Sequence, residues 1–354
     1  MESTGKIILV VVLIVIFVMF APMLYSSAIG GLGGGVLFSS GSKTLSQPKA
    51  NQNGTIAISY DAGENFEEAQ VHTSTQPQIL VISTYQKFYI AGTNNGLIMS
   101  RDGGLNWFEL SDLEKNIDNT TTIYDFANGP GGTFYIAAYK NNHGVLYVTN
   151  DNFFTVTNIW EEASMAVRGI TADSEYLYMG LDDGRLLRYS FAKQTFEKIT
   201  TFTSGIQTLT FVGNGNLIVG LNNGGVYTDN GTRSKFGKIT TPSSNFFVSQ
   251  SGLRLTKDNQ NRGSLFIASP SGLYKSDDSG AFWNSINTIL STKAKVAALS
   301  VQNGLIYLTS DAKFYKSTDG GKSWKVSEPM PTNSKYGTLY VDNSGKIVIV
   351  GTRK

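Results

Sequence analysis

The chain has 354 residues, of which 41% are hydrophobic and 12% aromatic, so it can bury a large core. Its formal net charge is +2; without Lys6, Lys43, Lys49 and Glu2 of the N-terminal segment, the 29 basic and 27 acidic residues become 26 of each, a balance that argues against a nucleic-acid partner. The absence of cysteine excludes disulfides, thiol catalysis and cysteine-ligated metals.

The N-terminus carries an apolar run typical of a membrane segment. Residues 7–25, IILVVVLIVIFVMFAPMLY, contain no charge and would span roughly 28 Å as a helix, close to the ~30 Å hydrocarbon core. A cleaved signal peptide is the alternative, because residues 26–28 (SSA) fit a cleavage pattern, but the run exceeds the ~7–15 residues usual for a signal peptide. We predict an uncleaved anchor in residues 1–25 that contacts the lipid bilayer through residues 7–25, with the bulk of the chain on the non-cytoplasmic side.

Residues 26–52 are rich in glycine and serine and predict a tether. The stretch GGLGGG at 30–35 neither follows a strand nor opens a βαβ unit, which argues against a phosphate-binding loop. A flexible chain of about 25 residues reaches roughly 28 Å, so the domain that follows would stay near the membrane surface.

From residue 53 to the end, one plan of short β-rich runs recurs. In KFYIAGTNNGLIMS (87–100) and TFYIAAYKNNHGVLYVT (133–149), an apolar strand B is followed by a tight turn and a strand C. Asn and Gly in these turns tolerate positive φ and favour hairpins. A strand A precedes each unit and a strand D follows it, giving four antiparallel strands. We expect strand A of six repeats at 79–84, 122–127, 168–173, 207–212, 245–250 and 296–301.

The repeats indicate a ring of seven blades. A short phrase, S/T-x-D-x-G-x-x-W/F, ends strand C, and successive Asp positions are 41, 49, 39, 40, 48 and 41 residues apart, a period typical of a β-propeller blade. Residues 337–354 supply only strands A and B, and residues 54–71 only strands C and D, so together they complete a seventh blade. We predict an all-β, seven-bladed β-propeller of four-stranded antiparallel blades over residues 53–354. The Asp positions are Asp61, Asp102, Asp151, Ser190, Asn230, Asp278 and Asp319.

The phrase itself is predicted to be structural. Its Asp can accept backbone N–H groups of its own turn, its Gly allows a left-handed step, and its aromatic residue can pack between sheets. It resembles the Asp-box, or BNR repeat, of sialidases, sortilin-type receptors, xyloglucan-degrading enzymes and photosystem assembly factors, which implies the fold but no particular activity. The residues assigned to it are Ser59, Asp61, Gly63, Phe66, Ser100, Asp102, Gly104, Trp107, Asp151, Ser276, Asp278, Gly280, Trp283, Ser317, Asp319, Gly321 and Trp324.

Catalytic signatures are weak. The sequence has no Arg-Ile-Pro element of the kind the sialidase resemblance would require, and its two histidines, His72 and His143, lie in different repeats, so we expect no metal site and no cofactor. A glycoside hydrolase that uses two carboxylates remains the alternative. Its candidate carboxylates are Asp173, Asp182, Asp183 and Asp311.

The resemblance implies that binding residues lie on the face that carries the B–C turns and the D–A connections, where propellers of this family often bind ligands near the central axis; the phrases occupy the opposite face. The connections at 69–78 and 111–122 are the longest. We therefore expect a membrane-anchored, non-catalytic scaffold of a cell surface, envelope or virion, which binds a protein partner, with carbohydrate as the other candidate ligand. The candidate turn residues are Asn94, Asn95, Asn141, Asn142, His143, Asp182, Asp183, Arg185, Asn222 and Asn223.

Overall fold

The computed structural model describes the propeller part of the chain. The chain divides into two compact units, residues 1–46 and 47–354, and every described residue lies in the second. The predicted anchor at 1–25 and tether at 26–52 therefore lie outside the described residues. No helix within the described residues is long and apolar enough to cross a membrane. The described residues are 55–110, 116–211, 215–239, 254–257, 264–269, 272–278, 280–286, 296–302, 304–310, 312–327 and 335–352.

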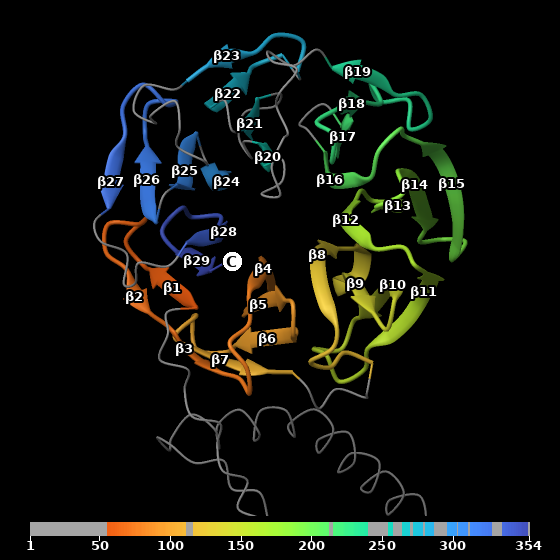
Figure 1. Ribbon diagram of the computed structural model, residues 1–354, viewed down its shortest axis with the longest axis horizontal. Helices are drawn as coiled ribbons and strands as arrows, with labels where there is room; N and C mark the ends of the chain where they lie inside the picture. The colour runs from red at the N-terminus through yellow and green to blue at the C-terminus, as the bar shows by residue number, and fades with distance from the viewer. Residues whose placement is uncertain are drawn as a thin grey trace, which may run out of the picture. The chain divides into compact units, whose positions relative to one another are not determined.

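Seven sheets stand around a central axis, each with strand A innermost and strand D near the rim (Figure 1). β-Branched and aromatic residues fill the strands, as expected for pleated, buried surfaces. Blade 1 contains β4 (Ile79–Tyr85), β5 (Phe88–Thr93), β6 (Gly96–Ser100) and β7 (Asn106–Glu109); blade 2 contains β8 (Thr122–Asn128), β9 (Phe134–Lys140), β10 (His143–Thr149) and β11 (Thr157–Ala163); blade 3 contains β12 (Val167–Ala172), β13 (Tyr176–Leu181), β14 (Arg185–Ser190) and β15 (Thr195–Thr201).

The remaining blades follow the same order, and a short 3-10 turn, η1 (Pro130–Gly132), joins β8 to β9. Blade 4 contains β16 (Ile206–Phe211), β17 (Leu217–Leu221), β18 (Val226–Thr228) and β19 (Gly237–Ile239); blade 5 contains β20 (Arg254–Lys257), β21 (Leu265–Ser269), β22 (Gly272–Ser276) and β23 (Asn284–Ser285); blade 6 contains β24 (Val296–Gln302), β25 (Leu305–Ser310), β26 (Lys313–Ser317) and β27 (Lys325–Ser327); blade 7 contains β28 (Tyr336–Val341), β29 (Val348–Thr352), β1 (Ile56–Ser59) and β2 (Glu67–Glu68).

Blade 7 closes the ring with strands from both ends of the domain. The strand order is β2-β1-β29-β28, and β1 pairs with β29 in an antiparallel register that places Ala57 opposite Val350. The innermost strand β28 contacts β4 of blade 1 on one side and β24 of blade 6 on the other. The predicted seven-bladed propeller and its split blade are therefore confirmed.

Two details differ from the prediction. The 69–78 connection, expected to be a loop, contains β3 (Gln70–His72), which pairs in parallel with β7 and makes blade 1 a five-stranded sheet. The innermost strand of blade 5 is Arg254–Lys257, whereas the sequence placed it at 245–250, which lie outside the described residues.

The hydrophobic core is divided among the seams between blades. Seven buried apolar clusters lie within the described residues, and each joins two neighbouring blades. Small residues on strand B allow this close approach. A Cβ on Gly351 would lie 2.5 Å from Ile79, and a Cβ on Gly92 would lie 2.5 Å from Ile123, in each case on the next blade. Adding a side chain at either glycine would push two blades apart.

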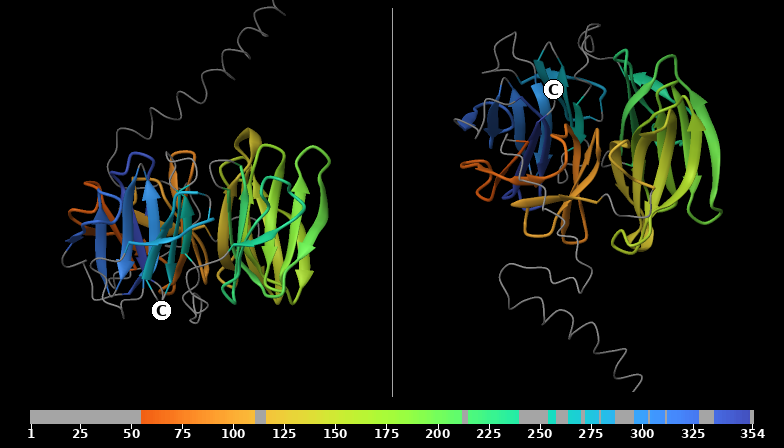
Figure 2. Two further views of the ribbon diagram at one scale, coloured as in Figure 1. Left: turned by 90° about the horizontal axis from the view of Figure 1, so that it is seen from above. Right: turned by 60° about the horizontal axis from the view of Figure 1, so that its bottom comes forward.

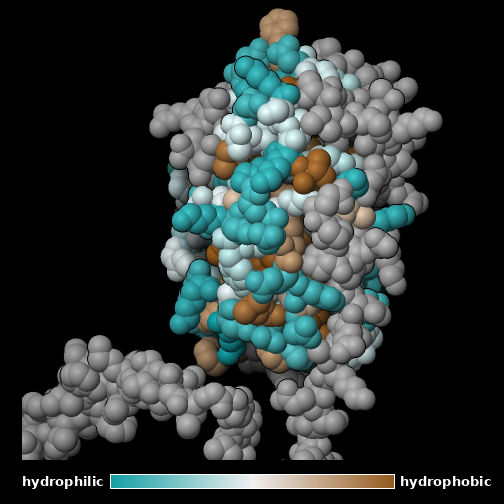
Figure 3. All heavy atoms as spheres, turned by 90° about the vertical axis from the view of Figure 1, so that its left-hand side faces the viewer, coloured by the Kyte–Doolittle hydropathy of each residue, from teal (hydrophilic) through white to brown (hydrophobic). Residues whose placement is uncertain are grey.

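The ring has two faces, and the strands run between them (Figure 2). We call the face with the B–C turns and D–A connections the B–C face, and the face with the A–B and C–D turns the C–D face. The side formed by blades 6 and 7 is mostly hydrophilic, with scattered hydrophobic residues among its described atoms (Figure 3). Scattered apolar residues of this kind are usual on a protein surface and do not mark a docking site.

Candidate functional site

The complete Asp phrases form hydrogen-bonded turns on the C–D face. In blade 1, the Ser100 hydroxyl donates to Asp102 Oδ1 at 2.8 Å and accepts the Gly104 backbone N–H at 2.8 Å. Asp102 also accepts the backbone N–H of Asn106 at 3.0 Å, and Trp107 Nε1 donates to the Gly104 carbonyl at 2.8 Å. The Ser–Asp–Gly bonds recur in blades 5, 6 and 7. The aspartate thus holds its own turn.

The glycine of the phrase also fits one blade against another. Gly63 has φ +84°, and a Cβ there would lie 2.2 Å from Phe314 of blade 6. Gly104 has φ +102°, and a Cβ there would lie 2.4 Å from Ile58 of blade 7. Both the backbone conformation and the space exclude a side chain.

The phrase is altered in blade 4, where the sequence assigned the Asp position to Asn230. There the neighbouring Asp229, fully buried, accepts the backbone N–H of Leu217 at 2.8 Å and of Gly231 at 3.0 Å, and pairs with Arg233 at 2.8 Å. The carboxylate of this blade therefore stands one residue earlier than the aligned repeats predicted, and Asn230 does not take the place of the phrase Asp.

On the B–C face, several candidate turn residues fix the backbone. Asn94 Oδ1 accepts the Gln78 N–H at 2.7 Å, and Asp182 Oδ1 accepts the Ala166 N–H at 3.1 Å. The backbone N–H of Asn222 donates to the Gly205 carbonyl at 2.8 Å. These contacts extend the ladder between strands A and B, so the three residues have a structural role.

Most of the remaining candidate side chains make hydrogen bonds within the chain, and one does not. Arg185 donates to Glu162 at 2.6 Å and to Asp183 at 2.5 Å, which joins blade 3 to blade 2. Three other candidate side chains also make hydrogen bonds within the chain. Asn142 bonds to Tyr139 and Ser164, Asn223 bonds to Gly225, and Asn95 bonds to Asn119. The exposed Asn141 amide, by contrast, makes no hydrogen bond to a described residue.

Part of the 111–122 connection, residues 116–121, lies in the crevice between blades 1 and 2. Asp118 anchors it: its Oδ2 pairs with Lys140 Nζ at 2.9 Å, and its Oδ1 accepts the Thr120 N–H at 2.9 Å. Burial acts to raise the pKa of Asp118, but the bonds from Thr120 and Lys140 outweigh it and lower the pKa to about 2. Asp118 is therefore a carboxylate at every physiological pH.

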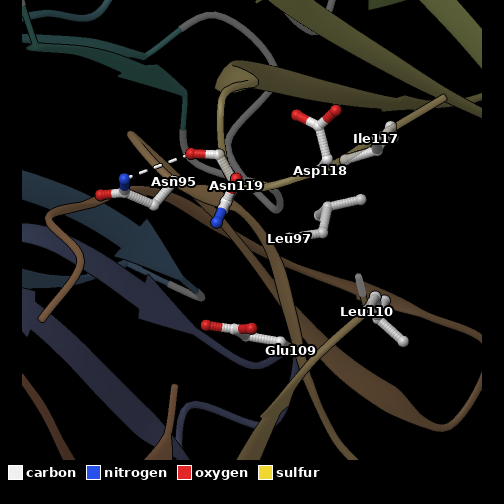
Figure 4. Close-up of a pocket in the computed structure, with 8 residues that line it drawn as sticks. Asn95, Leu97, Glu109, Leu110, Ile117, Asp118 and Asn119 are labelled. Carbon is white, nitrogen blue, oxygen red and sulfur yellow. Dashed lines mark hydrogen bonds between the residues drawn. The ribbon is translucent and has the colours of Figure 1, made fainter. Parts of the chain in front are cut away.

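A hollow lies on each side of this segment. Towards blade 1 is a small pocket around Asn95 and Asn119, where the Asn95 amide donates to the Asn119 carbonyl at 3.3 Å (Figure 4). Towards blade 2 is a cavity of about 190 Å³. The cavity is lined by Asn116, Lys140, Asn141, Val145, Tyr147, Asn158 and Glu161.

A second group lies on the innermost strands of blades 2 and 3. Tyr124 and Arg168 are each the extra residue of a β-bulge, a device that re-aims side chains. The Arg168 guanidinium stacks on the Tyr124 ring, 4.2 Å from its centroid, and lies 3.8 Å from Asp182 Oδ2. No described residue accepts a hydrogen bond from this guanidinium, so its N–H groups could donate to a ligand.

Asp125, next to Tyr124, joins the same two strands. One of its oxygens accepts the Phe126 N–H at 2.9 Å and the other accepts the Ile170 N–H of blade 3 at 2.9 Å. Burial raises the pKa of Asp125 to about 7, although both backbone bonds act to lower it.

This pKa predicts a pH-dependent stability. Because the folded carboxyl holds its proton up to a pKa of about 7 and an unfolded one only to ~3.9, stability falls as the pH rises between these values, by at most about 4 kcal/mol. Asp125→Asn will remove this slope in urea unfolding measured from about pH 4 to 8. Asp118→Asn is the control, since its lowered pKa places its effect below that window. An unchanged slope in Asp125→Asn would refute the assignment.

Sequence reasoning missed both groups in part. It named Asn141, Asp182 and the 111–122 connection, but not Lys140, Tyr147, Asn158, Glu161, Tyr124, Arg168 or Asp125. One signal was available: Arg168 and Asp125 are charged residues within the predicted innermost strands 168–173 and 122–127, whose only other charged residue is Asp173 at a strand end. Among the described residues, no three His, Asp or Glu side chains are grouped so that they could hold a metal ion.

Comparisons with known proteins show the fold. No family model and no curated protein matches the chain. YCF48 bound to a D1 peptide superposes with a TM-score of 0.62 at 14% identity, covering 79% of this chain and 95% of that one. YCF48 from Cyanidioschyzon merolae gives 0.60 at 12% identity, with coverage of 79% and 97%.

An extracellular domain gives a similar superposition. The extracellular domain of the putative one-component system BT4673 from B. thetaiotaomicron gives a TM-score of 0.61 at 14% identity. The match covers 79% of this chain but only 40% of that one. At these identities the likeness extends to the propeller fold alone.

Proposed function

We propose that the protein is a membrane-anchored propeller that binds a protein partner on its B–C face and carries out no catalysis. The observation that carries the proposal is the arrangement of Arg168 on β12: its guanidinium lies over the Tyr124 ring and 3.8 Å from Asp182 Oδ2, and it donates no hydrogen bond to a described residue. The described arginines Arg185, Arg188 and Arg233, in contrast, each donate to a carboxylate of this chain. Arginine is among the residue types enriched at binding hot spots.

The comparisons support a binding role. One of the similar propellers is described as bound to a D1 peptide and another as the extracellular domain of a one-component system. By analogy, we propose that residues 7–25 hold this propeller at a membrane, on its non-cytoplasmic side, as a component of a cell surface, envelope or virion.

The glycosidase alternative has one favourable feature, the raised pKa of Asp125. However, both oxygens of Asp125 accept backbone N–H groups, and the nearby Asp182 is occupied by Ala166 and Arg168. A general acid needs an available proton opposite a second carboxylate. Turnover of fluorogenic glycosides that is lost in Asp125→Asn would favour the enzyme over the scaffold.

Site-specific photo-crosslinking tests the scaffold. A photo-reactive phenylalanine analogue replaces Gln207, next to the axial opening, or Asn223, in a B–C turn, in the membrane-bound protein. Phe154 and Phe282, which are 76% and 77% exposed on the C–D face, serve as matched positions. We expect one partner polypeptide to be crosslinked from the B–C positions, to a degree reduced by Arg168→Gln. Crosslinks from the C–D positions alone would contradict the proposal.

A further inference from the structure

The cavity beside Lys140 presents several unused hydrogen-bonding groups. Asn158 Nδ2 donates to Glu161 Oε2 at 2.8 Å, which leaves the second amide N–H of Asn158 and Glu161 Oε1 without a hydrogen bond to a described residue. The Asn141 amide makes no hydrogen bond to a described residue. The Tyr147 hydroxyl donates to the Asn116 carbonyl at 2.9 Å, so its oxygen can still accept. Donors and acceptors thus alternate around the cavity.

The charges of the cavity favour a neutral ligand. Lys140 is already paired with Asp118 at 2.9 Å, so it offers no net positive charge to an anion. Glu161 adds a carboxylate whose side chain is 48% exposed and whose Oε1 lies 3.9 Å from the His143 ring. An anionic ligand would meet this carboxylate without compensation.

The lining and the size narrow the ligand further. Val145 and Tyr147, 2% and 3% exposed, are buried behind a lining whose other residues are polar. The volume of about 190 Å³ is smaller than the ~300–1,000 Å³ of sites for drug-sized ligands, which suits one ring.

We propose that this cavity binds a single neutral sugar ring, the terminal or branching unit of a glycan. Adjacent hydroxyls would bridge Glu161 Oε1 and the Asn158 amide, and a third would meet Asn141. This site is separate from the axial opening around Arg168, so it stands whether or not a protein binds there. It would let the scaffold recognise a glycosylated surface.

The test uses the purified full-length protein in detergent and a panel of methyl glycosides of neutral, acidic and amino sugars. Saturation-transfer NMR and titration calorimetry measure binding, which we expect at about millimolar strength for a neutral glycoside. Glu161→Gln and Asn141→Gly should each weaken it at least tenfold. Glycine is chosen because Asn141 has φ +50°, a conformation that alanine would strain.

Asn230→Gly is the matched control, because Asn230 is also exposed with φ +49° but lies on the C–D face. It should leave glycoside binding unchanged, and all variants should keep the wild-type unfolding midpoint. The proposal is overturned by wild-type protein that binds no neutral glycoside, by selective binding of acidic or amino sugars, or by binding that survives both cavity variants. Crosslinking at the axial opening is unaffected by these results, so the two proposals fail separately.

Discussion

Replacing Trp107 with alanine will lower the free energy of unfolding of the propeller by about 3–5 kcal/mol. Trp107 is 0% exposed and packs with Ile58 and Ile79 in the seam between blades 7 and 1, where the ring closes. Its Nε1–H also donates to the Gly104 carbonyl at 2.8 Å. The variant would therefore leave a large cavity and an unpaired carbonyl at the joint between the two ends of the domain.

Denaturant unfolding of the variant and the wild type, followed by circular dichroism, measures this loss. Trp324→Ala provides a graded comparison: its indole makes the same bond to a glycine carbonyl, at 3.1 Å, but is only partly buried, so a smaller loss is expected. Phe154→Ala, at a side chain 76% exposed on the same face, should change stability by less than ~0.5 kcal/mol. Equal losses of unfolding free energy in Trp107→Ala and Phe154→Ala would show that the aromatic residue of the Asp phrase does not stabilise the seam between blades 7 and 1.

The architecture was predictable because the same four-strand pattern recurs at a regular spacing along the sequence. The incomplete repeats at 54–71 and 337–354 predict a blade that both ends of the domain share, and the β1–β29 pairing confirms it. The fifth strand β3 was not predictable, since three residues, Gln70–His72, carry no periodic signal and pair with β7 through backbone groups that any sequence possesses.

The candidate site was predictable only in outline. Turn residues such as Asn141 are visible from local composition, but the stacking of Arg168 on Tyr124 joins residues from different repeats. It depends on two β-bulges, which no turn signal marks. The shift from Asn230 to Asp229 has the same origin: the carboxylate is placed by the buried N–H of Leu217, a partner on another strand.

Joining the two ends of the ring covalently will stabilise it strongly. In the double variant Ala57→Cys, Val350→Cys, the two cysteines stand opposite each other on β1 and β29. Opposed residues of antiparallel strands have Cα atoms about 4.5–5.5 Å apart, within the range of a disulfide. Because the crosslink would close almost the whole propeller into one loop, we expect the free energy of unfolding to rise by about 3–4 kcal/mol, after the loss of the Val350 methyl groups.

The cysteine-free sequence makes this experiment unambiguous, because the introduced pair has no competing thiol. Thiol titration after mild oxidation and unfolding with and without reductant give the readout. The control pairs Ala57→Cys with Ile349→Cys: Ala57 faces the seam with blade 6, whereas Ile349 faces the seam with blade 1, so these thiols point to opposite sides of the sheet and should stay free. A disulfide in the control but not in the opposed pair would mean that β1 meets β29 in another register. No disulfide in either would mean that the ring is not closed by these strands.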